Sequence, residues 1–326
     1  MGRAALIASC IARPGLGLLI AASALAMAAD PSVSPMCPAS PQRTIIWQPW
    51  AAHAGLDASG WRALGQEVQR QGYAHVLLQW ASYGDHEFWP RGEAGWLATG
   101  LRQWETTGLK LIFGLHMDPD YYRVLQQPDP VLRAHLAASR DKSVALARRV
   151  LRRPPPLELA GWYLPQEIDD LNWQSPARER MLRNYLAPMR DALSAMAPGA
   201  PQTPLYASVF YSGASSPEDF ARMLLRLHRG TGVVWIVQDG LGTDRLPPER
   251  TAAYLRAVAS TLPPEGWRAL LEVFDEQRTP GQPPRFEPSD EATIARRAGL
   301  WCLATGRQAQ IVFSLNQVMA GMLPLR

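Results

Sequence analysis

The sequence predicts an α/β fold, a single (β/α)8 TIM barrel. Three observations lead to this prediction: 326 residues suit one large core, eight strand-like apolar runs alternate with helix-length stretches, and no Gly-rich phosphate loop follows the first run. Gln48, Pro49 and Trp50 stand where a doubly wound sheet would carry that loop, so such a sheet is the second choice. The expected strands are 44–50, 75–80, 109–116, 157–164, 205–211, 233–238, 269–274 and 310–315.

The stretches between these runs have the pattern of amphipathic helices. Asp57 caps the stretch 57–71, which places Trp61, Leu64 and Val68 on one face. Proline stands at or near the first turn of four further stretches, where its fixed φ suits a helix start. These expected helices are 130–151, 176–196, 217–228 and 247–262.

The chain begins with what we interpret as a targeting segment. Arg3 and Arg13 precede an apolar run over 16–26, and Ala26-Met27-Ala28 has the small-residue pattern that signal peptidase cuts. The run is too short and too rich in alanine for a stable membrane anchor. We therefore expect a signal peptide over 1–29, a Pro/Ser-rich linker over 30–42 and the barrel over 43–326, in a periplasmic or secreted protein.

Export changes the meaning of the cysteines. Removal of Cys10 with the signal peptide leaves Cys37 and Cys302, an even pair in an oxidising compartment. They precede the first and last expected strands, which are neighbours in a closed barrel. We expect a disulfide between them, with two free buried thiols as the alternative.

Composition restricts the partners. The net charge of +4 is carried almost wholly by arginine, since Lys110 and Lys142 are the only lysines, and the basic residues are interleaved with acids. We therefore expect no nucleic-acid surface and no polybasic membrane tail. The 12 tryptophans suit a sugar-binding cleft as well as a core, because pyranose rings stack on aromatic faces. Nothing suggests an assembly, so a monomer is expected, and no cofactor is called for.

Two glutamates stand at the carboxyl ends of expected strands, where barrels bind their ligands. Glu167 follows Pro165, which is expected to end the strand 157–164, and Glu272 interrupts the apolar run 269–274. A buried carboxylate is costly unless it is hydrogen-bonded or paired, so an ion pair with arginine is the structural alternative. Two carboxylates across a barrel mouth supply what glycoside cleavage requires, a general acid and a nucleophile or base. Glu167 should have a raised pKa and Glu272 should remain ionised.

Other polar and aromatic residues are expected to share this rim and to bind substrate. A site rich in amides, aromatics and carboxylates fits a neutral polyhydroxylated ligand, an oligo- or polysaccharide, with Trp50, Trp80, Tyr163 and Tyr211 as platforms. Asp239 is expected to orient a catalytic group or to replace Glu272, and Glu276, in an expected solvated loop with Asp275, is a further substitute. The expected binding residues are Gln48, Trp50, Gln79, Trp80, His116, Tyr163, Gln166, Tyr211, Gln238 and Asp239.

Four sequence stretches resemble a family of exported bacterial barrels catalogued as a domain of unknown function and placed with the clan A retaining glycoside hydrolases. They are Trp47-Gln48-Pro49, Gly161-Trp162-Tyr163-Leu164-Pro165-Gln166-Glu167, Gln238-Asp239-Gly240 and Leu271-Glu272-Val273-Phe274. The resemblance covers most of 43–318 and implies that Glu167 is the acid/base and Glu272 the nucleophile. The clan usually has asparagine before its acid/base, whereas this chain has Gln166.

Two other functions remain open. One is a carbohydrate-binding barrel without catalysis in an exopolysaccharide system. The other is a metal-dependent polysaccharide deacetylase, in which His116 and Asp118 hold a divalent ion together with His53 and Asp239. A Ser-His-Asp hydrolase is not indicated, because the sequence has no Gly-x-Ser-x-Gly elbow.

Overall fold

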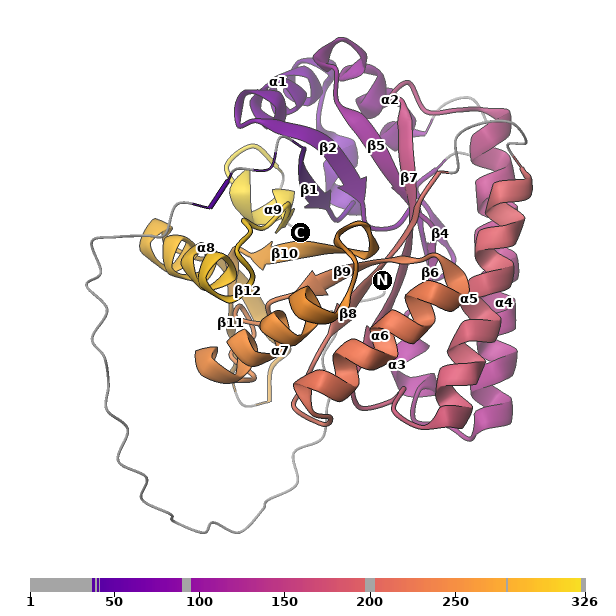
Figure 1. The fold of residues 1–326 in the computed structure, drawn as a ribbon. Coiled ribbons are helices and arrows are strands. Elements are labelled where there is room, and N and C mark those ends of the chain that lie inside the picture. Colours follow the sequence, from indigo (N-terminus) through magenta and orange to yellow (C-terminus); the bar gives the residue numbers. More distant parts are fainter. Residues whose placement is uncertain are drawn as a thin grey trace.

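Eight parallel strands close into a barrel in the computed structural model, which describes residues 37–38, 40, 42–89, 95–196, 203–279 and 281–323 (Figure 1). The first and last strands pair directly, with Thr44 opposite Ile311, and this pairing completes the ring. The predicted (β/α)8 barrel is therefore confirmed. In chain order the barrel strands are β1 (Arg43–Trp47), β2 (Tyr73–Leu78), β5 (Lys110–Gly114), β7 (Leu159–Asp169), β8 (Leu205–Phe210), β9 (Val234–Gln238), β10 (Trp267–Glu272) and β13 (Ile311–Phe313).

Helices surround the barrel and begin where the sequence supplies caps. The side chains of Asp57, Ser175, Ser216 and Asp290 each accept a hydrogen bond from a backbone N–H in the first turn. The helix expected to end at residue 228 runs three residues further, to Thr231 before a left-handed glycine. The helices are α1 (Ala58–Arg70), α2 (Trp96–Arg102), α3 (Tyr121–Val124), α4 (Asp129–Arg152), α5 (Pro176–Ala195), α6 (Pro217–Thr231), α7 (Pro248–Thr261), α8 (Glu291–Thr305) and α9 (Leu315–Val318), with 3-10 turns η1 (Ala51–Gly55), η2 (Glu105–Thr107) and η3 (Pro264–Gly266).

Two hydrophobic clusters form the core. The larger one packs the outer faces of the strands against the helices. The smaller one fills the barrel interior with one residue each from seven strands: Ile46, Leu77, Ile112, Tyr163, Ile236, Leu270 and Ile311. Every tryptophan except Trp50 and Trp96 is buried, so most of the tryptophan excess builds the core.

Strand β7 does not end at Pro165 as the sequence suggested. Its pairing with β8 shifts register between Leu164 and Ile168, so that extra residues bulge out of the ladder before pairing resumes at Ile168 and Asp169. Proline has no N–H to donate to the ladder, and a bulge is a place where none is required. Glu167 lies in this bulge.

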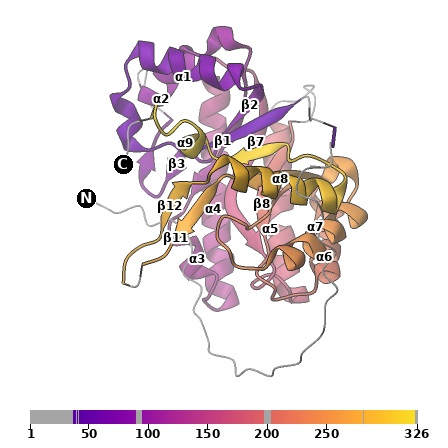
Figure 2. The ribbon, with the colours of Figure 1, turned by 90° about the vertical axis from the view of Figure 1, so that its left-hand side faces the viewer.

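Smaller sheets decorate the barrel. A three-stranded sheet combines β3 (Ser82–Tyr83), β4 (His86–Glu87) and β6 (His116–Met117). A hairpin of β11 (Phe274–Gln277) and β12 (Arg285–Pro288) projects beyond the barrel (Figure 2). Residues 275 and 276, expected in a solvated loop, belong to this hairpin, where Asp275 pairs with Arg297 and Glu276 with Arg278.

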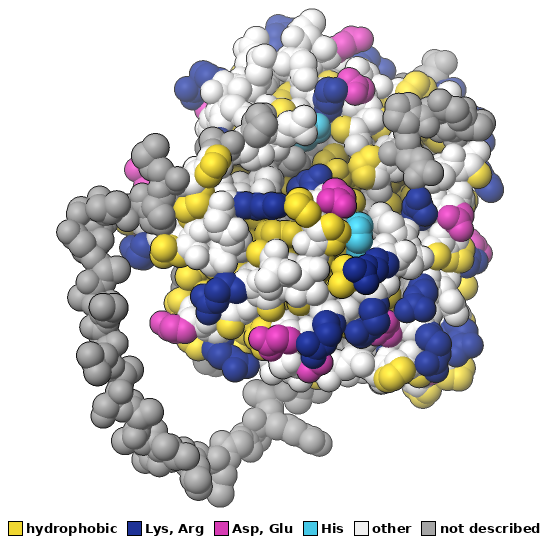
Figure 3. Space-filling view, viewed as in Figure 1, with side chains coloured by type: hydrophobic (Ala, Val, Ile, Leu, Met, Phe, Trp, Pro, Cys, Tyr) yellow, Lys and Arg dark blue, Asp and Glu magenta, His cyan; other side chains and the backbone are white. Residues whose placement is uncertain are grey.

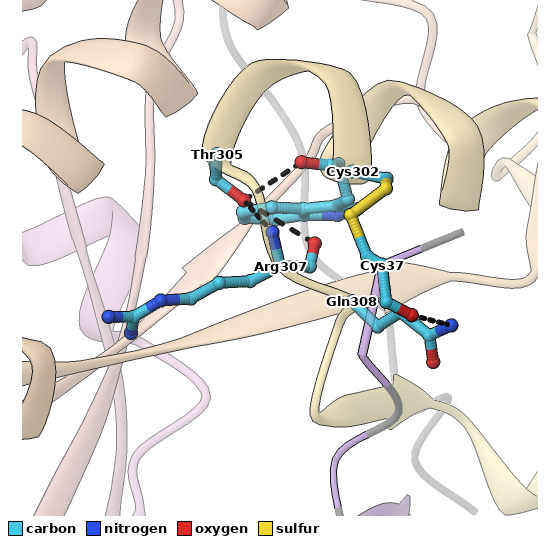
Figure 4. Close-up of a disulfide and its surroundings, with 6 residues drawn as sticks. Cys37, Cys302, Thr305, Arg307 and Gln308 are labelled. Carbon is cyan, nitrogen blue, oxygen red and sulfur yellow. Dashed lines mark hydrogen bonds between the residues drawn. A yellow bond between two sulfur atoms is a disulfide. The ribbon is translucent and has the colours of Figure 1, made fainter. Parts of the chain in front are cut away.

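A disulfide joins Cys37 to Cys302, whose Cα atoms lie 5.8 Å apart (Figure 4). It ties the segment before β1 to the last turn of α8, at the barrel end where the strands begin. Cys302 therefore lies in a helix, several residues before β13 and not directly at its start. The Gln308 side chain donates a 3.0 Å hydrogen bond to the carbonyl of Cys37 at the same place.

The surface and the amino-terminal segment add two observations. On the face shown in Figure 3, arginine and lysine side chains are interspersed with acidic ones. Within the described ranges, no helix has the length and apolar character needed to cross a bilayer. The expected signal peptide and all but a few residues of the expected linker lie outside the described residues.

Candidate active site

A cavity of about 960 Å³ opens at the carboxyl ends of the barrel strands. Its walls come from most of the strands and from the segments that follow them, including the β11–β12 hairpin. The structure brings nine of the expected site residues together here: Gln48, Trp50, Gln79, Tyr163, Glu167, Tyr211, Gln238, Asp239 and Glu272.

Glu167 is held in the cavity by two side-chain donors. The Tyr122 hydroxyl donates to Oε2 at 2.5 Å, and the Gln238 amide donates to Oε1 at 2.8 Å. The Tyr121 hydroxyl bonds the backbone carbonyl of Glu167 at 2.8 Å and fixes the bulge. Burial raises the pKa of Glu167, although the two donors and the charge of Arg245 oppose the rise. This direction agrees with the expectation for an acid/base.

Glu272 is the last residue of β10 and is only 3% exposed. Its Oε2 accepts a 2.7 Å hydrogen bond from the backbone N–H of Gly242, in the segment after β9. A Cβ at position 242 would lie 2.9 Å from that oxygen and 2.6 Å from the Phe274 carbonyl, so only glycine allows this approach. Burial and the neighbouring Asp239 carboxylate raise the pKa of Glu272 strongly. This direction runs against the expectation that Glu272 stays ionised.

Asp239 is fully buried beside Glu272 and accepts only from fixed donors. Its Oδ2 receives the backbone N–H of Glu272 at 3.3 Å and the Trp301 indole N–H at 3.2 Å, and its Oδ1 receives the backbone N–H of Leu241 at 3.1 Å. Burial raises the pKa of Asp239 as well, but these donors stabilise its ionised form. Asp239 thus orients the strand end that carries Glu272.

Arg297 of α8 ties the surrounding segments together from behind. Its guanidinium donates to the carbonyls of Glu272, Phe274 and Leu241 at 2.9–3.0 Å and pairs with Asp275 at 2.6 Å. The end of β10, the start of the hairpin and the segment after β9 therefore share one buried cation. This contact fixes the position of Glu272 relative to Gly242.

Two glutamines on neighbouring strands carry unpartnered buried atoms. Within the described residues, Gln48 Nε2 and Gln79 Oε1 have no hydrogen-bond partner, although both residues are 3% exposed and line the cavity. Asn316 fixes the backbone of Gln48 by a reciprocal pair of 3.1 Å hydrogen bonds. An orphan donor beside an orphan acceptor suits a sugar hydroxyl, which both accepts and donates.

Three expected binding residues lie behind the cavity wall. Trp80 packs against Trp50 and Tyr83. Gln166 donates to the carbonyl of His116 at 2.8 Å and accepts from Tyr185 at 3.2 Å. None of Trp80, His116 and Gln166 lines the cavity. They support the residues that do.

The aromatic lining differs from the expected set. Trp50 is partly exposed in the cavity, whereas Tyr163 and Tyr211 are 1% and 5% exposed and offer little ring surface. Tyr211 stacks face to face on Tyr254, with ring centroids 4.3 Å apart. The other rings of the lining belong to His53, Tyr122, Phe210, Phe274, Phe286 and Phe313.

His53 and His116, the two histidines considered as metal ligands, each form hydrogen bonds within the protein. His53 Nδ1 accepts from the Trp47 indole and the Trp50 backbone N–H, and His116 Nδ1 bonds the Ser82 hydroxyl at 2.9 Å. Burial lowers the pKa of both histidines to about 4. Within the part of the chain that the structure describes, no three His, Cys, Asp or Glu side chains are grouped to hold a metal ion. The donor set expected for a deacetylase is thus not assembled.

Sequence reasoning missed four residues that build the site. Tyr122 follows the third barrel strand in a Tyr-Tyr pair, and Gly242 lies two residues after the Gln238-Asp239-Gly240 stretch, so both stood near recognised motifs. Arg245 lines the cavity from the same segment. Arg297 lies within a helix and gave no signal, because only the tertiary fold brings α8 behind β10.

The fold is shared with solved carbohydrate-active proteins. A putative α-L-fucosidase from Bacteroides thetaiotaomicron aligns over 88% of this chain and 90% of its own, with a TM-score of 0.64 and 16% identity. A chitinase from Chromobacterium violaceum aligns over 85% and 95%, with a TM-score of 0.51 and 10% identity. At these identities the likeness shows the fold alone.

Sequence comparison identifies the family. The uncharacterized protein YbcH of Escherichia coli (strain K12) is 32% identical over 258 residues, which are 78% of this chain and 84% of that protein. A family model, the Domain of unknown function (DUF4434), matches residues 43–324, which span the whole barrel. Together with the barrel and its two strand-end glutamates, these matches show that the chain belongs to the DUF4434 family.

Proposed function

We propose that this protein is an exported glycoside hydrolase that cleaves an oligo- or polysaccharide with Glu167 and Glu272. One observation carries the proposal. Two glutamates from β7 and β10 line one cavity, and neither forms an ion pair with an Arg or Lys of the described residues. A structural ion pair would account for a buried glutamate without catalysis, and that account does not apply here.

The proposed chemistry is a two-step displacement with retention. Glu167, protonated, gives its proton to the glycosidic oxygen as the bond to the anomeric carbon breaks, while the Glu272 carboxylate forms a glycosyl ester. Glu167, now ionised, takes a proton from water, which attacks the anomeric carbon and releases Glu272. Each carboxyl oxygen of protonated Glu167 has a hydrogen-bond partner. The Tyr122 hydroxyl can accept a hydrogen bond from the acid O–H, while Gln238 donates one to the other oxygen.

Glu272 must be ionised before this sequence begins. Burial beside Asp239 favours the protonated form of Glu272, and a nucleophile must be ionised. The Gly242 N–H and the charge of Arg297 favour the ionised form. Activity requires Glu272 to be ionised and Glu167 to be protonated at the same time, so we expect kcat/KM to pass through a maximum as the pH changes.

The remaining polar groups supply binding. Gln48 and Gln79 present an unsatisfied donor and acceptor to a sugar hydroxyl, and Trp50 offers a partly exposed ring. The bond between Cys37 and Cys302 is compatible with an oxidising compartment, which supports a periplasmic or secreted protein.

The test is turnover on a panel of oligosaccharides by the wild type and two variants. Glu167→Gln and Glu272→Gln should each keep the melting temperature within a few degrees and lose about 10²- to 10⁴-fold in kcat. Glu158→Gln is the matched control, because Glu158 immediately precedes the same strand at its opposite end and is exposed beside Lys110. Full turnover in both active-site variants would contradict the proposal. Binding without turnover in the wild type would favour a carbohydrate-binding barrel instead.

A further inference from the structure

Arg245 lines the cavity without a carboxylate partner. It lies in the segment between β9 and α7 and is partly buried. Its guanidinium stands over the Phe210 ring, 5.8 Å from the ring centroid. No acid among the described residues lies within the 4.0 Å ion-pair distance of Arg245. An apolar ring that holds a cation in place leaves its donors free for a ligand.

Several other partly buried arginines of this protein are paired with carboxylates. Arg178 pairs with Asp129 at 2.6 Å, Arg149 with Glu87 at 3.1 Å, and Arg297 with Asp275 at 2.6 Å. Withdrawing a guanidinium from water is costly, and in each of these cases a carboxylate offsets the cost. Among the described residues, Arg43, Arg268 and Arg307 are also partly buried without a carboxylate, but they donate to carbonyls or stand over rings away from the cavity. Arg245 lines the cavity.

Three of the four acids that line the cavity are already engaged, and the fourth, Glu287, is exposed on the hairpin strand β12. Both oxygens of Glu167 accept hydrogen bonds from neutral donors, and Asp239 and Glu272 are bonded to backbone N–H groups. Arg245 nevertheless acts on Glu167 at longer range, since its charge opposes the rise in the pKa of Glu167. Arg245 and Glu167 line the same cavity, so one ligand can contact both.

A second unpaired arginine belongs to the same cavity. Arg285, on β12 of the hairpin, lines the cavity and is exposed, with no ion pair to the described part of the chain. The hairpin is joined to the Arg245 segment, because the Glu276 N–H donates to the Gly242 carbonyl at 2.7 Å. Two guanidinium groups on connected segments therefore face one ligand.

From these contacts we propose that the ligand is an anionic glycan, and that Arg245 binds a carboxylate or sulfate group on a sugar unit next to the scissile bond. Guanidinium groups bind both anions through paired N–H donors. Arg285 adds a weaker, solvent-screened contact. This inference deepens the proposed function by naming its substrate class, and it replaces the neutral ligand expected from sequence.

Binding to matched pairs of probes tests the inference. Tetragalacturonate carries carboxylates only, and its carboxyl-reduced form is a neutral galactose tetramer. A sulfated carrageenan tetrasaccharide and its desulfated form make the same comparison for sulfate. Titration calorimetry would use the Glu272→Gln variant, in which turnover of the probes is expected to be strongly slowed. We expect at least one acidic probe to bind about tenfold or more tightly than its neutral partner, with an affinity that falls as salt rises.

Variants assign the effect to Arg245. Arg245→Ala should remove the preference for the acidic probe, and Arg245→Lys should keep part of it, which covers the case in which the alanine variant folds poorly. Arg250→Ala is the control, since Arg250 is exposed on α7 and does not line the cavity. The inference is overturned if both acidic probes bind no more tightly than their neutral partners, or if Arg245→Ala behaves like Arg250→Ala.

This result is separable from the proposed function. Hydrolysis of neutral glycans with no preference for acidic ones would leave the glycosidase and remove the anionic substrate. Arg245-dependent binding of an acidic glycan that the wild type does not hydrolyse would leave an anionic-glycan-binding protein and remove the catalysis.

Discussion

The backbone N–H of Glu272 donates a hydrogen bond to the buried carboxylate of Asp239 across 3.3 Å. The Asp239 carboxylate thus holds the end of β10, where the Glu272 carboxylate lies. Burial raises the pKa of Glu272, and the Asp239 charge raises it further, because two negative charges in a buried site repel each other. Asp239 therefore acts on both the backbone position and the protonation of Glu272.

Chemical rescue should assign the two glutamates their roles. Glu272→Gly should be inactive, and azide should restore turnover and yield a glycosyl azide of inverted anomeric configuration, because azide replaces the missing nucleophile. Glu167→Ala should instead give an azide of retained configuration and remain active on substrates whose leaving group needs no proton. NMR of the products distinguishes the cases, and the opposite pattern would exchange the two roles.

The loop glycine that contacts Glu272 should be essential for activity. Gly242→Ala places a methyl group 2.6 Å from the Phe274 carbonyl and 2.9 Å from Glu272 Oε2, so the loop must shift and its hydrogen bond must lengthen. We expect a fall in kcat of about 10²-fold, the usual cost of misplacing a catalytic group. Gly299→Ala is the control, because a Cβ there meets nothing within 4 Å. Equal kinetics in the two variants would remove Gly242 from the site.

Stability should fall as the pH rises through neutrality. The folded-state pKa of Glu272 is raised, so the group destabilises the fold once it is ionised in the unfolded chain but still protonated in the folded one. The free energy of unfolding should therefore decrease from the ordinary glutamate range upward, by at most about 1.4 kcal/mol per pH unit for this group. Glu272→Gln should flatten that slope in urea titrations at several pH values. An unchanged slope would mean that Glu272 titrates normally.

Three buried glutamines should respond differently to replacement by leucine. Gln79→Leu and Gln48→Leu remove side-chain atoms that lack a protein partner, so stability should be unchanged or higher while kcat/KM falls. Gln166→Leu breaks bonds to His116 and Tyr185 and should cost about 1–3 kcal/mol of stability. Chemical denaturation and steady-state kinetics on all three variants make the comparison. Stability losses of equal size would show that Gln48 and Gln79 are structural.

Loss of the disulfide should destabilise the barrel without changing its site. The bond spans 265 residues and ties the amino-terminal segment to α8, so replacing both Cys37 and Cys302 by serine should lower the free energy of unfolding by roughly 2–5 kcal/mol. The cavity lies at the opposite barrel end, and kcat should be kept.

In the chain without residues 1–29, a thiol titration after denaturation without reductant should find no reactive group. Two reactive groups would show that the bond does not form in solution.

The sequence predicted best those cavity residues whose position follows from the end of the strand that carries them. Glu167 and Glu272 were found because a carboxylate at the end of an apolar run is conspicuous, and parallel strands bring such ends to one rim. Trp80, His116 and Gln166 also stand at or near the ends of apolar runs, yet they lie behind the cavity wall. Alternation along a strand decides which way a side chain faces, and irregular backbone beyond the strand ends breaks that alternation.

The alternation of apolar runs and amphipathic stretches determined the barrel by itself, because that pattern can bury its surface only as strands covered by helices. It also placed the two glutamates and the cysteine pair. The tertiary structure decided what surrounds them: the Gly242 contact, the Tyr122 donor, the Arg297 tie and the unpaired Arg245. Those contacts join segments far apart in the chain, and their distances follow from packing that no local pattern encodes.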